Sequence, residues 1–92
     1  MLRQKKKALQ IFEWLISWGE KTIAYGECGE GIRFARSLIA DCYYRIARIH
    51  EEKRERGKAL RAYRQHLLRR KRGVRSIYPL SEVRRKYAAL QA

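Results

Sequence analysis

The stretch from Arg61 to Arg75, RAYRQHLLRRKRGVR, holds the side chains of this chain that are best suited to bind anions. Seven of its residues are Arg or Lys, with apolar residues between them. The planar guanidinium group of arginine donates paired hydrogen bonds to a phosphate or a carboxylate. The stretch therefore predicts a helix with a buried face and a basic face, and the candidate phosphate-binding residues are Arg61, Arg64, Arg69, Arg70, Lys71, Arg72 and Arg75.

The positive charge of the chain lies mainly in its second half. The formal net charge is +14 over 92 residues, and residues 47–92 hold 15 basic but only 4 acidic side chains. No Asp or Glu occurs between Glu55 and Glu82, so nearby acidic residues do not balance the basic stretch. Such an excess is typical of proteins that bind nucleic acid, and an acidic protein surface is the second interpretation.

Four residues have side chains that bind zinc in other proteins: Cys28, Cys42, His50 and His66. Their spacing matches no common zinc module, so we expect no metal site. We expect both cysteines to be reduced thiols without a disulfide, which favours a cytoplasmic protein. No nucleophile, base and orienting group occur in a catalytic combination, so we expect neither an enzyme nor a cofactor.

The elements that position these residues are predicted to be helices. Apolar residues recur every three or four positions, and the chain has one proline. The pattern predicts helices over residues 4–25, over residues 32–53 and from residue 58 onward, and a short helix over residues 82–90. The expected fold class is all-α: a small helical bundle of three main helices plus a short C-terminal helix.

Charge and the glycine at position 73 divide the chain into two parts. Residues 1–72 are predicted to form the helical bundle domain, and residues 73–92 a basic C-terminal extension with a short helix. The basic residues of that helix extend the candidate phosphate-binding surface, and they are Arg84, Arg85 and Lys86.

The first predicted helix has apolar residues on more than one face, among them Trp14 and Trp18. This width indicates a helix that is contacted from two sides, or from one side and by a partner. Its apolar run is too short and too interrupted by charge to span a membrane, and we do not expect a membrane partner. In the second predicted helix, Phe34 is expected to widen the buried stripe.

The segment Tyr43–Leu68, YYRIARIHEEKRERGKALRAYRQHLL, resembles a single tetratricopeptide hairpin. The small, aromatic and aliphatic positions of that motif are occupied by Ala47, Ala59, Tyr63 and Leu67. The resemblance implies two antiparallel helices in close approach, with the aromatic side chain beside the small ones. From its backbone freedom, we expect Gly57 to form the corner between the two helices.

Two functions fit these observations. The first is a small basic helical protein that contacts the phosphate backbone of DNA or RNA non-specifically, because the basic stretch has no Asn and only one amide, Gln65. The alternative is a protein-binding accessory or inhibitor factor of the mobile-element type, which docks its basic helix on a larger nucleic-acid-processing enzyme. A protein partner or a homodimer would use Trp14 and Trp18 if they are exposed. A helix-turn-helix over residues 67–89 would need an unusually long turn.

Overall fold

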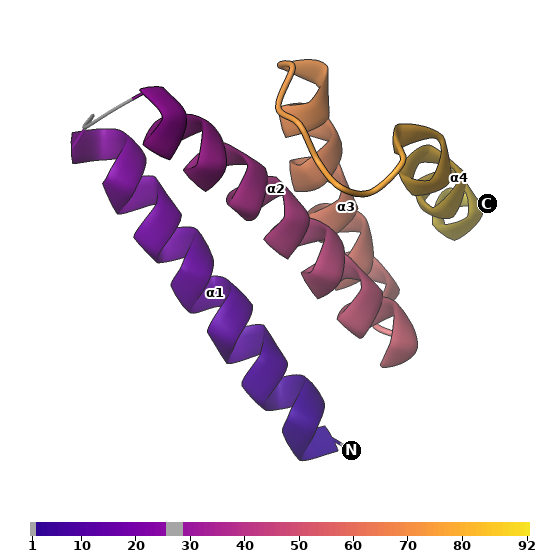
Figure 1. The fold of residues 1–92 in the computed structure, drawn as a ribbon. Helices are drawn as coiled ribbons and strands as arrows, with labels where there is room; N and C mark the ends of the chain where they lie inside the picture. Colours follow the sequence, from indigo (N-terminus) through magenta and orange to yellow (C-terminus); the bar gives the residue numbers. More distant parts are fainter. Residues whose placement is uncertain (1, 26–28) are drawn as a thin grey trace.

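Four α-helices form the part of the chain that the structure describes (Figure 1). The computed structural model describes residues 2–25 and 29–92, and within them no β-strand occurs. The helices are α1 (Leu2–Tyr25), α2 (Gly29–Glu52), α3 (Arg56–Lys71) and α4 (Leu80–Gln91). The predicted all-α bundle, with three main helices and a shorter last one, is confirmed. The glycine-rich connection between the first two helices falls partly on residues 26–28, outside the described residues.

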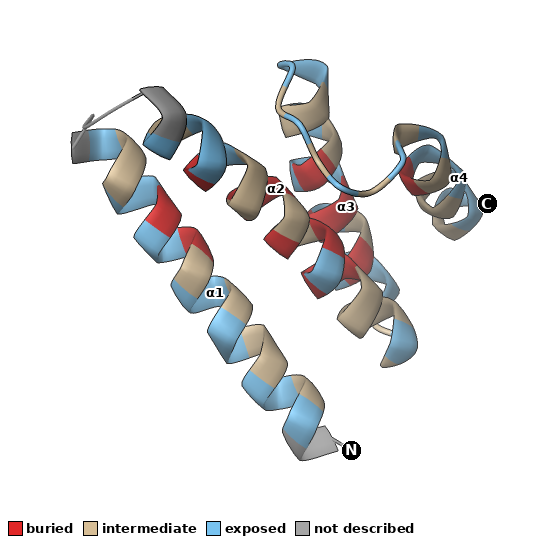
Figure 2. Ribbon diagram, in the orientation of Figure 1, coloured by how far each residue is buried: buried red, intermediate tan, exposed pale blue. Residues whose placement is uncertain are grey.

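Helix α2 is the centre of the bundle. Helices α1 and α3 both pack against it as antiparallel neighbours, and α4 packs against α3 (Figure 1). Buried positions lie on the sides of the helices that face one another (Figure 2). Small side chains at these contacts let the helix axes approach closely, and the completely buried alanines are Ala35, Ala40, Ala47 and Ala59.

Helix α1 passes close to α2 at Gly19. A Cβ atom at this position would lie 2.9 Å from Cγ1 of Ile39, so a side chain here would require Ile39 to move. Gly19 is therefore a contact residue inside a continuous helix, and its small size sets the distance between α1 and α2.

The core between α2, α3 and α4 is largely aromatic. Tyr63 and His66 of α3 and Val83 of α4 have no exposed surface. Tyr44 of α2 packs edge-on against Tyr63, with ring centroids 6.0 Å apart, and its ring centroid lies 4.0 Å from that of Tyr78. The basic C-terminal extension therefore contributes to the same core as the three main helices.

Helices α2 and α3 form the hairpin that resembles a tetratricopeptide repeat in its sequence. Ala47, Ala59 and Tyr63 are completely buried between the helices. The hydroxyl of Tyr63 donates a hydrogen bond to Oε2 of Glu51 at 2.8 Å, which fastens α3 to the last turn of α2. The close helix approach that the resemblance implies is thus present in this hairpin.

Arg54 forms the corner between α2 and α3, and the prediction that Gly57 does so is wrong. Arg54 has a φ of 60°, in the left-handed region. The amides of Arg54 and Glu55 donate to the carbonyl oxygens of Glu51 and His50 at 3.0 and 2.8 Å, as in a Schellman cap. Gly57 instead lies in the first turn of α3. The hydrogen bonds of this cap hold the backbone in a conformation that arginine alone does not favour.

Helix α3 ends in a second cap of the same kind, at Gly73. Its φ is 90°, and the amides of Gly73 and Val74 donate to the carbonyl oxygens of Arg70 and Arg69 at 3.0 and 3.1 Å. Residues 72–79 then connect α3 to α4, which is too long a connection for a standard helix-turn-helix.

Substitutions at the two caps should change the stability of the protein in opposite directions. Arg54→Gly should stabilise the protein by about 0.5–1 kcal/mol, because relief of the left-handed penalty exceeds the entropy cost of glycine. Gly73→Ala should destabilise it by about 1–2 kcal/mol, because alanine acquires that penalty. Urea unfolding followed by circular dichroism measures both changes. Destabilisation by Arg54→Gly would show that the Arg54 side chain has a stabilising contact that outweighs its strained backbone.

Candidate nucleic-acid interface

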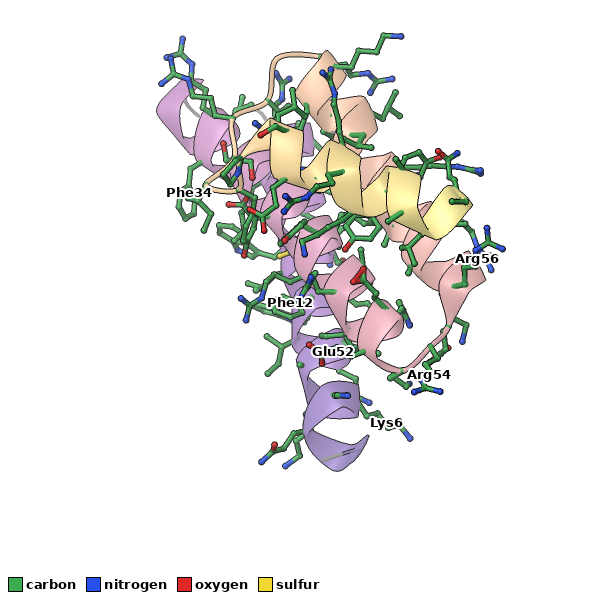
Figure 3. All side chains as sticks on the ribbon, turned by 90° about the vertical axis from the view of Figure 1, so that its right-hand side faces the viewer. Lys6, Phe12, Phe34, Glu52, Arg54 and Arg56 are labelled. Carbon is green, nitrogen blue, oxygen red and sulfur yellow. The ribbon has the colours of Figure 1, made fainter. Side chains whose placement is uncertain are left out.

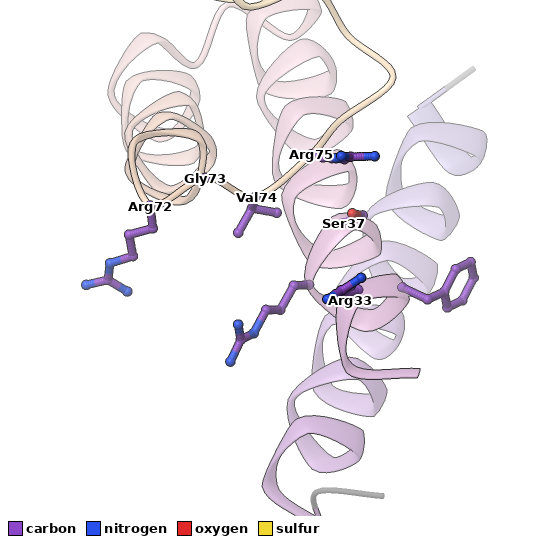
Figure 4. A pocket seen from close by; sticks show the side chains of 8 residues that line it. Arg33, Ser37, Arg72, Gly73, Val74 and Arg75 are labelled. Atoms are coloured by element: carbon purple, nitrogen blue, oxygen red, sulfur yellow. The ribbon is translucent and has the colours of Figure 1, made fainter. Parts of the chain in front are cut away.

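Arginines from the beginning of α2 and from the segment that directly follows α3 line a groove (Figure 4). The antiparallel packing of the hairpin brings these segments together, although they are far apart in the sequence. The groove has a cavity volume of about 600 Å³. We call its lining the arginine groove, and it consists of Arg33, Phe34, Arg36, Ser37, Arg72, Gly73, Val74 and Arg75.

The four arginines of the groove form no ion pair with any described carboxylate. Among the described side chains, every ion pair involves Glu51, Glu52 or Glu55, at the opposite end of the hairpin. There Glu55 lies 2.9 Å from the ammonium groups of both Lys53 and Lys58, and these hydrogen bonds lower the pKa of Glu55 to about 2. Among the described side chains, carboxylates thus offset part of the positive charge at that end of the hairpin, and none of them pairs with the arginines of the groove.

Among the described carboxylates, that of Glu20 lines a cavity beside the groove. Glu20 belongs to α1, and it shares this cavity of about 330 Å³ with Arg36, Arg69 and Arg72. It forms no ion pair with these arginines among the described contacts, so it weakens the positive potential on the α1 side without neutralising a particular guanidinium group.

Arg64 and Arg70, both predicted to bind phosphate, hold the C-terminal segment against α3. Nε of Arg64 donates to the hydroxyl of Tyr87 at 2.7 Å, and Nη1 of Arg70 donates to the carbonyl oxygen of Tyr78 at 2.7 Å. Arg56 donates in the same way to carbonyl oxygens in the last turn of α4, beside which it lies in Figure 3. These hydrogen bonds are spaced along α3 and hold α4 antiparallel to it. The guanidinium groups of Arg64 and Arg70 therefore already donate hydrogen bonds within the fold.

The remaining predicted residues of α3 are in different surroundings. The guanidinium group of Arg69 lies over the ring of Tyr43, 4.7 Å from its centroid, and donates to Oε1 of Gln65 at 2.9 Å. Arg61 is exposed and lines a separate groove between α1 and α3. Lys71 is exposed at the last position of α3.

The basic residues of α4 lie outside the arginine groove. Arg84 and Arg85 are exposed, and Lys86 lines another groove of about 660 Å³ with residues of α1 and α2. Of the ten predicted phosphate-binding residues, the structure therefore brings Arg72 and Arg75 together in the arginine groove.

Arg33, Phe34 and Arg36 line the groove but were not predicted from the sequence as site residues. Phe34 was expected to widen the buried stripe of α2, but 62% of its surface is exposed, and it projects from the outer surface of the bundle (Figure 3). The only available signal was the order Arg-Phe-Ala-Arg near the beginning of α2. This order of residues indicates a binding site only when the end of α3 is known to lie beside the beginning of α2.

The candidate partner-binding residues are exposed on the outer face of α1. Trp14 is 64% exposed and Trp18 is 41% exposed. Ile11, one turn before Trp14, is 58% exposed. Their spacing of three and four residues places them on one side of the helix, and we call them the α1 stripe.

Cys42 is a free, buried thiol on α2. Burial, together with the nearby charge of Asp41, raises its pKa to about 11, so the reactive thiolate form is strongly disfavoured. The prediction for Cys28 lies outside the described residues. No group of three or more His, Cys, Asp or Glu side chains that could hold a metal occurs in the described part of the chain.

Comparisons of the chain with protein-family models, with curated proteins and with solved structures find no match. Among the described helices, none is long and apolar enough to cross a membrane. The function must therefore be inferred from the residues of this chain.

His66 is the buried titratable group that supports the end of α3. Its Nδ1 lies 2.6 Å from the carbonyl oxygen of Ala40, which identifies Nδ1–H as the donor, and its Nε2 lies 3.4 Å from Nη1 of Arg70. Burial lowers the pKa of His66, and the positive charge of Arg70 lowers it further, against the opposing effect of the Ala40 hydrogen bond. Neutral His66 is therefore part of the folded state.

The protein should become less stable as the pH falls below about 6.5. Below this pH, His66 binds a proton in the unfolded chain but not in the folded protein. The free energy of unfolding is therefore highest above the pKa of His66 in the unfolded chain, and it falls as the pH drops towards the lower pKa of His66 in the folded protein. Between about pH 7.5 and about pH 5.5 the loss from this group is up to about 1.4 kcal/mol. The pKa of His50 is also lowered by burial, so the comparison uses a His50→Asn background.

Urea unfolding at the two pH values checks this prediction. His66→Asn preserves a donor for the Ala40 carbonyl and should show a smaller loss of stability at the lower pH. An equal loss in the two proteins would mean that His66 does not control this pH dependence.

Proposed function

We propose that this protein binds nucleic acid non-specifically through its phosphate backbone, with the arginine groove as the main contact. The observation that supports this most strongly is the convergence of Arg33, Arg36, Arg72 and Arg75 on one concave surface without a described ion-pair partner. A guanidinium group can donate two hydrogen bonds to two oxygens of one phosphate. Each phosphate that is neutralised in this way releases cations that were condensed on the nucleic acid.

The composition of the groove supports contact with the backbone over recognition of base sequence. Its described lining residues include no Asn, Gln, Asp or Glu, the side chains that most often distinguish bases by their edges. Among these described residues, Ser37 is the only one with an uncharged polar side chain. Binding through arginine, shape and charge is sequence-tolerant.

The charge of the whole chain favours the same partner. A net charge of +14 on a small bundle attracts polyanions from a distance and opposes the compact state through self-repulsion. A bound polyanion would relieve that repulsion, and it would stabilise the folded protein because it binds the native state.

The salt dependence of binding tests this function. With four phosphate contacts, the slope of log affinity against log salt on duplex DNA should be about −3 to −4. Replacing Arg36, Arg72 and Arg75 together with Gln should make the slope less negative by about 2 to 3. Fluorescence anisotropy of a labelled oligonucleotide, titrated at several KCl concentrations, measures it.

A second triple variant, Arg61→Gln, Arg84→Gln and Arg85→Gln, provides the matched control. It removes the same charge from exposed positions outside the groove, and it should change the slope by less than about 1. Equal losses in the two triple variants would show that net charge alone governs binding. An unchanged slope in the groove variant would contradict the proposed site.

A second candidate function is binding of a protein partner, as an accessory or inhibitor factor of a nucleic-acid-processing enzyme. The exposure of the α1 stripe favours it, because a row of large apolar side chains with two tryptophans is typical of interfaces.

Because Trp14 and Trp18 are exposed, acrylamide should readily quench the tryptophan fluorescence of the dilute protein. Strong protection from quenching at the lowest concentration would show that the tryptophans are covered, and would remove the support for this candidate.

A further inference from the structure

The arginine groove combines two kinds of recognition chemistry. Four arginines provide the charge, and Phe34, which is also among the lining residues, has 62% of its surface exposed. An exposed phenylalanine loses the hydrophobic stabilisation that burial would provide. Because Phe34 is among the residues that line the groove, a ligand bound there can contact its ring.

The ring of Phe34 has no described aromatic or cation–π partner. The described aromatic contacts involve Tyr44 with its neighbours, and the described cation–π pairs are Arg45 with Phe12 and Arg69 with Tyr43. The face of Phe34 is therefore available to a flat ligand. Every nucleobase presents such a face, so stacking on Phe34 would be tolerant of sequence.

A base can stack on Phe34 only if it has left its own stack. In a duplex the bases are paired and stacked inside the helix, and a protein reaches the backbone and the groove edges alone. The hollow of about 600 Å³ is within the range that accommodates a small ligand, so it has room for an extruded or unpaired nucleotide. Phosphate-binding arginines and an aromatic platform in one groove are the combination that single-strand binding uses.

We propose that the arginine groove binds single-stranded nucleic acid, with phosphates on its arginines and one base stacked on Phe34. This rests on the proposed function and goes further by naming the strand state of the ligand. Ser37 lies within the same lining and supplies a hydroxyl donor to the backbone. Glu20, in the adjoining cavity, opposes phosphate binding from the α1 side.

The test compares single-stranded and duplex probes at one KCl concentration. The probes are a fluorescein-labelled oligodeoxythymidylate of about 12 nucleotides and a mixed-sequence duplex of about the same length. We expect tighter binding of the single strand. Phe34→Ala should weaken single-strand binding about 5- to 100-fold and leave duplex binding within about twofold.

Two variants control for other effects of the substitution. Phe34→Tyr keeps a stacking ring and should retain single-strand affinity. Ile77→Ala truncates another large exposed side chain, 80% exposed and outside the groove, and should have no effect. Because Phe34 is exposed, circular dichroism should show the same helicity in all of these proteins.

Three results would overturn the inference. They are unchanged single-strand affinity in Phe34→Ala, tighter binding of the duplex, and equal losses in Phe34→Ala and Phe34→Tyr. If the groove arginine variant still loses affinity in these cases, the proposed function survives and only the single-strand inference fails. If neither the arginine variant nor Phe34→Ala changes binding of either probe, both fail.

Discussion

The antiparallel contact between α2 and α3 is the constraint on which the rest of the molecule depends. Alanines on both helices are completely buried, so the two backbones lie close together along the hairpin. This packing puts the beginning of α2 beside the end of α3, and only this juxtaposition brings Arg33 and Arg36 to Arg72 and Arg75. The Schellman cap at Gly73 then turns the chain back across α2, so that Arg75 completes the groove.

The same hairpin separates the charges of the protein. Its closed end holds Glu51, Glu52 and Glu55 with their basic partners, whereas its open end holds the arginine groove. Along α3, a further set of arginines donates to α4 and to the segment before it. Arginine thus has two roles in this chain: it fastens α4 to the bundle, and it lines a surface that has no described counterion.

The helices were predictable because apolar residues spaced three and four positions apart share one face in an α-helix but not in a strand. The basic stretch was also recognisable, but its members could not be sorted from the sequence. Arg70 and Arg72 are two positions apart, yet one donates to the Tyr78 carbonyl and the other lines the groove. That difference depends on where α4 packs. Phe34 was assigned to the buried stripe because it is apolar and lies close to that stripe on the helix. The spacing of apolar residues does not show which parts of a helix a neighbouring helix covers. Gly57 was assigned to the corner by its conformational freedom, whereas the capping hydrogen bonds hold Arg54 there.

Nuclear magnetic resonance of the arginine side chains would test the role of the groove most directly. The Nε–Hε signals of the individual arginines can be followed while a single-stranded oligonucleotide is added. The largest changes should occur at Arg33, Arg36, Arg72 and Arg75, while Arg64 and Arg70, which donate within the fold, should change little. Changes spread evenly over the exposed arginines, or largest at Arg84 and Arg85, would contradict the assignment of the groove as the binding surface.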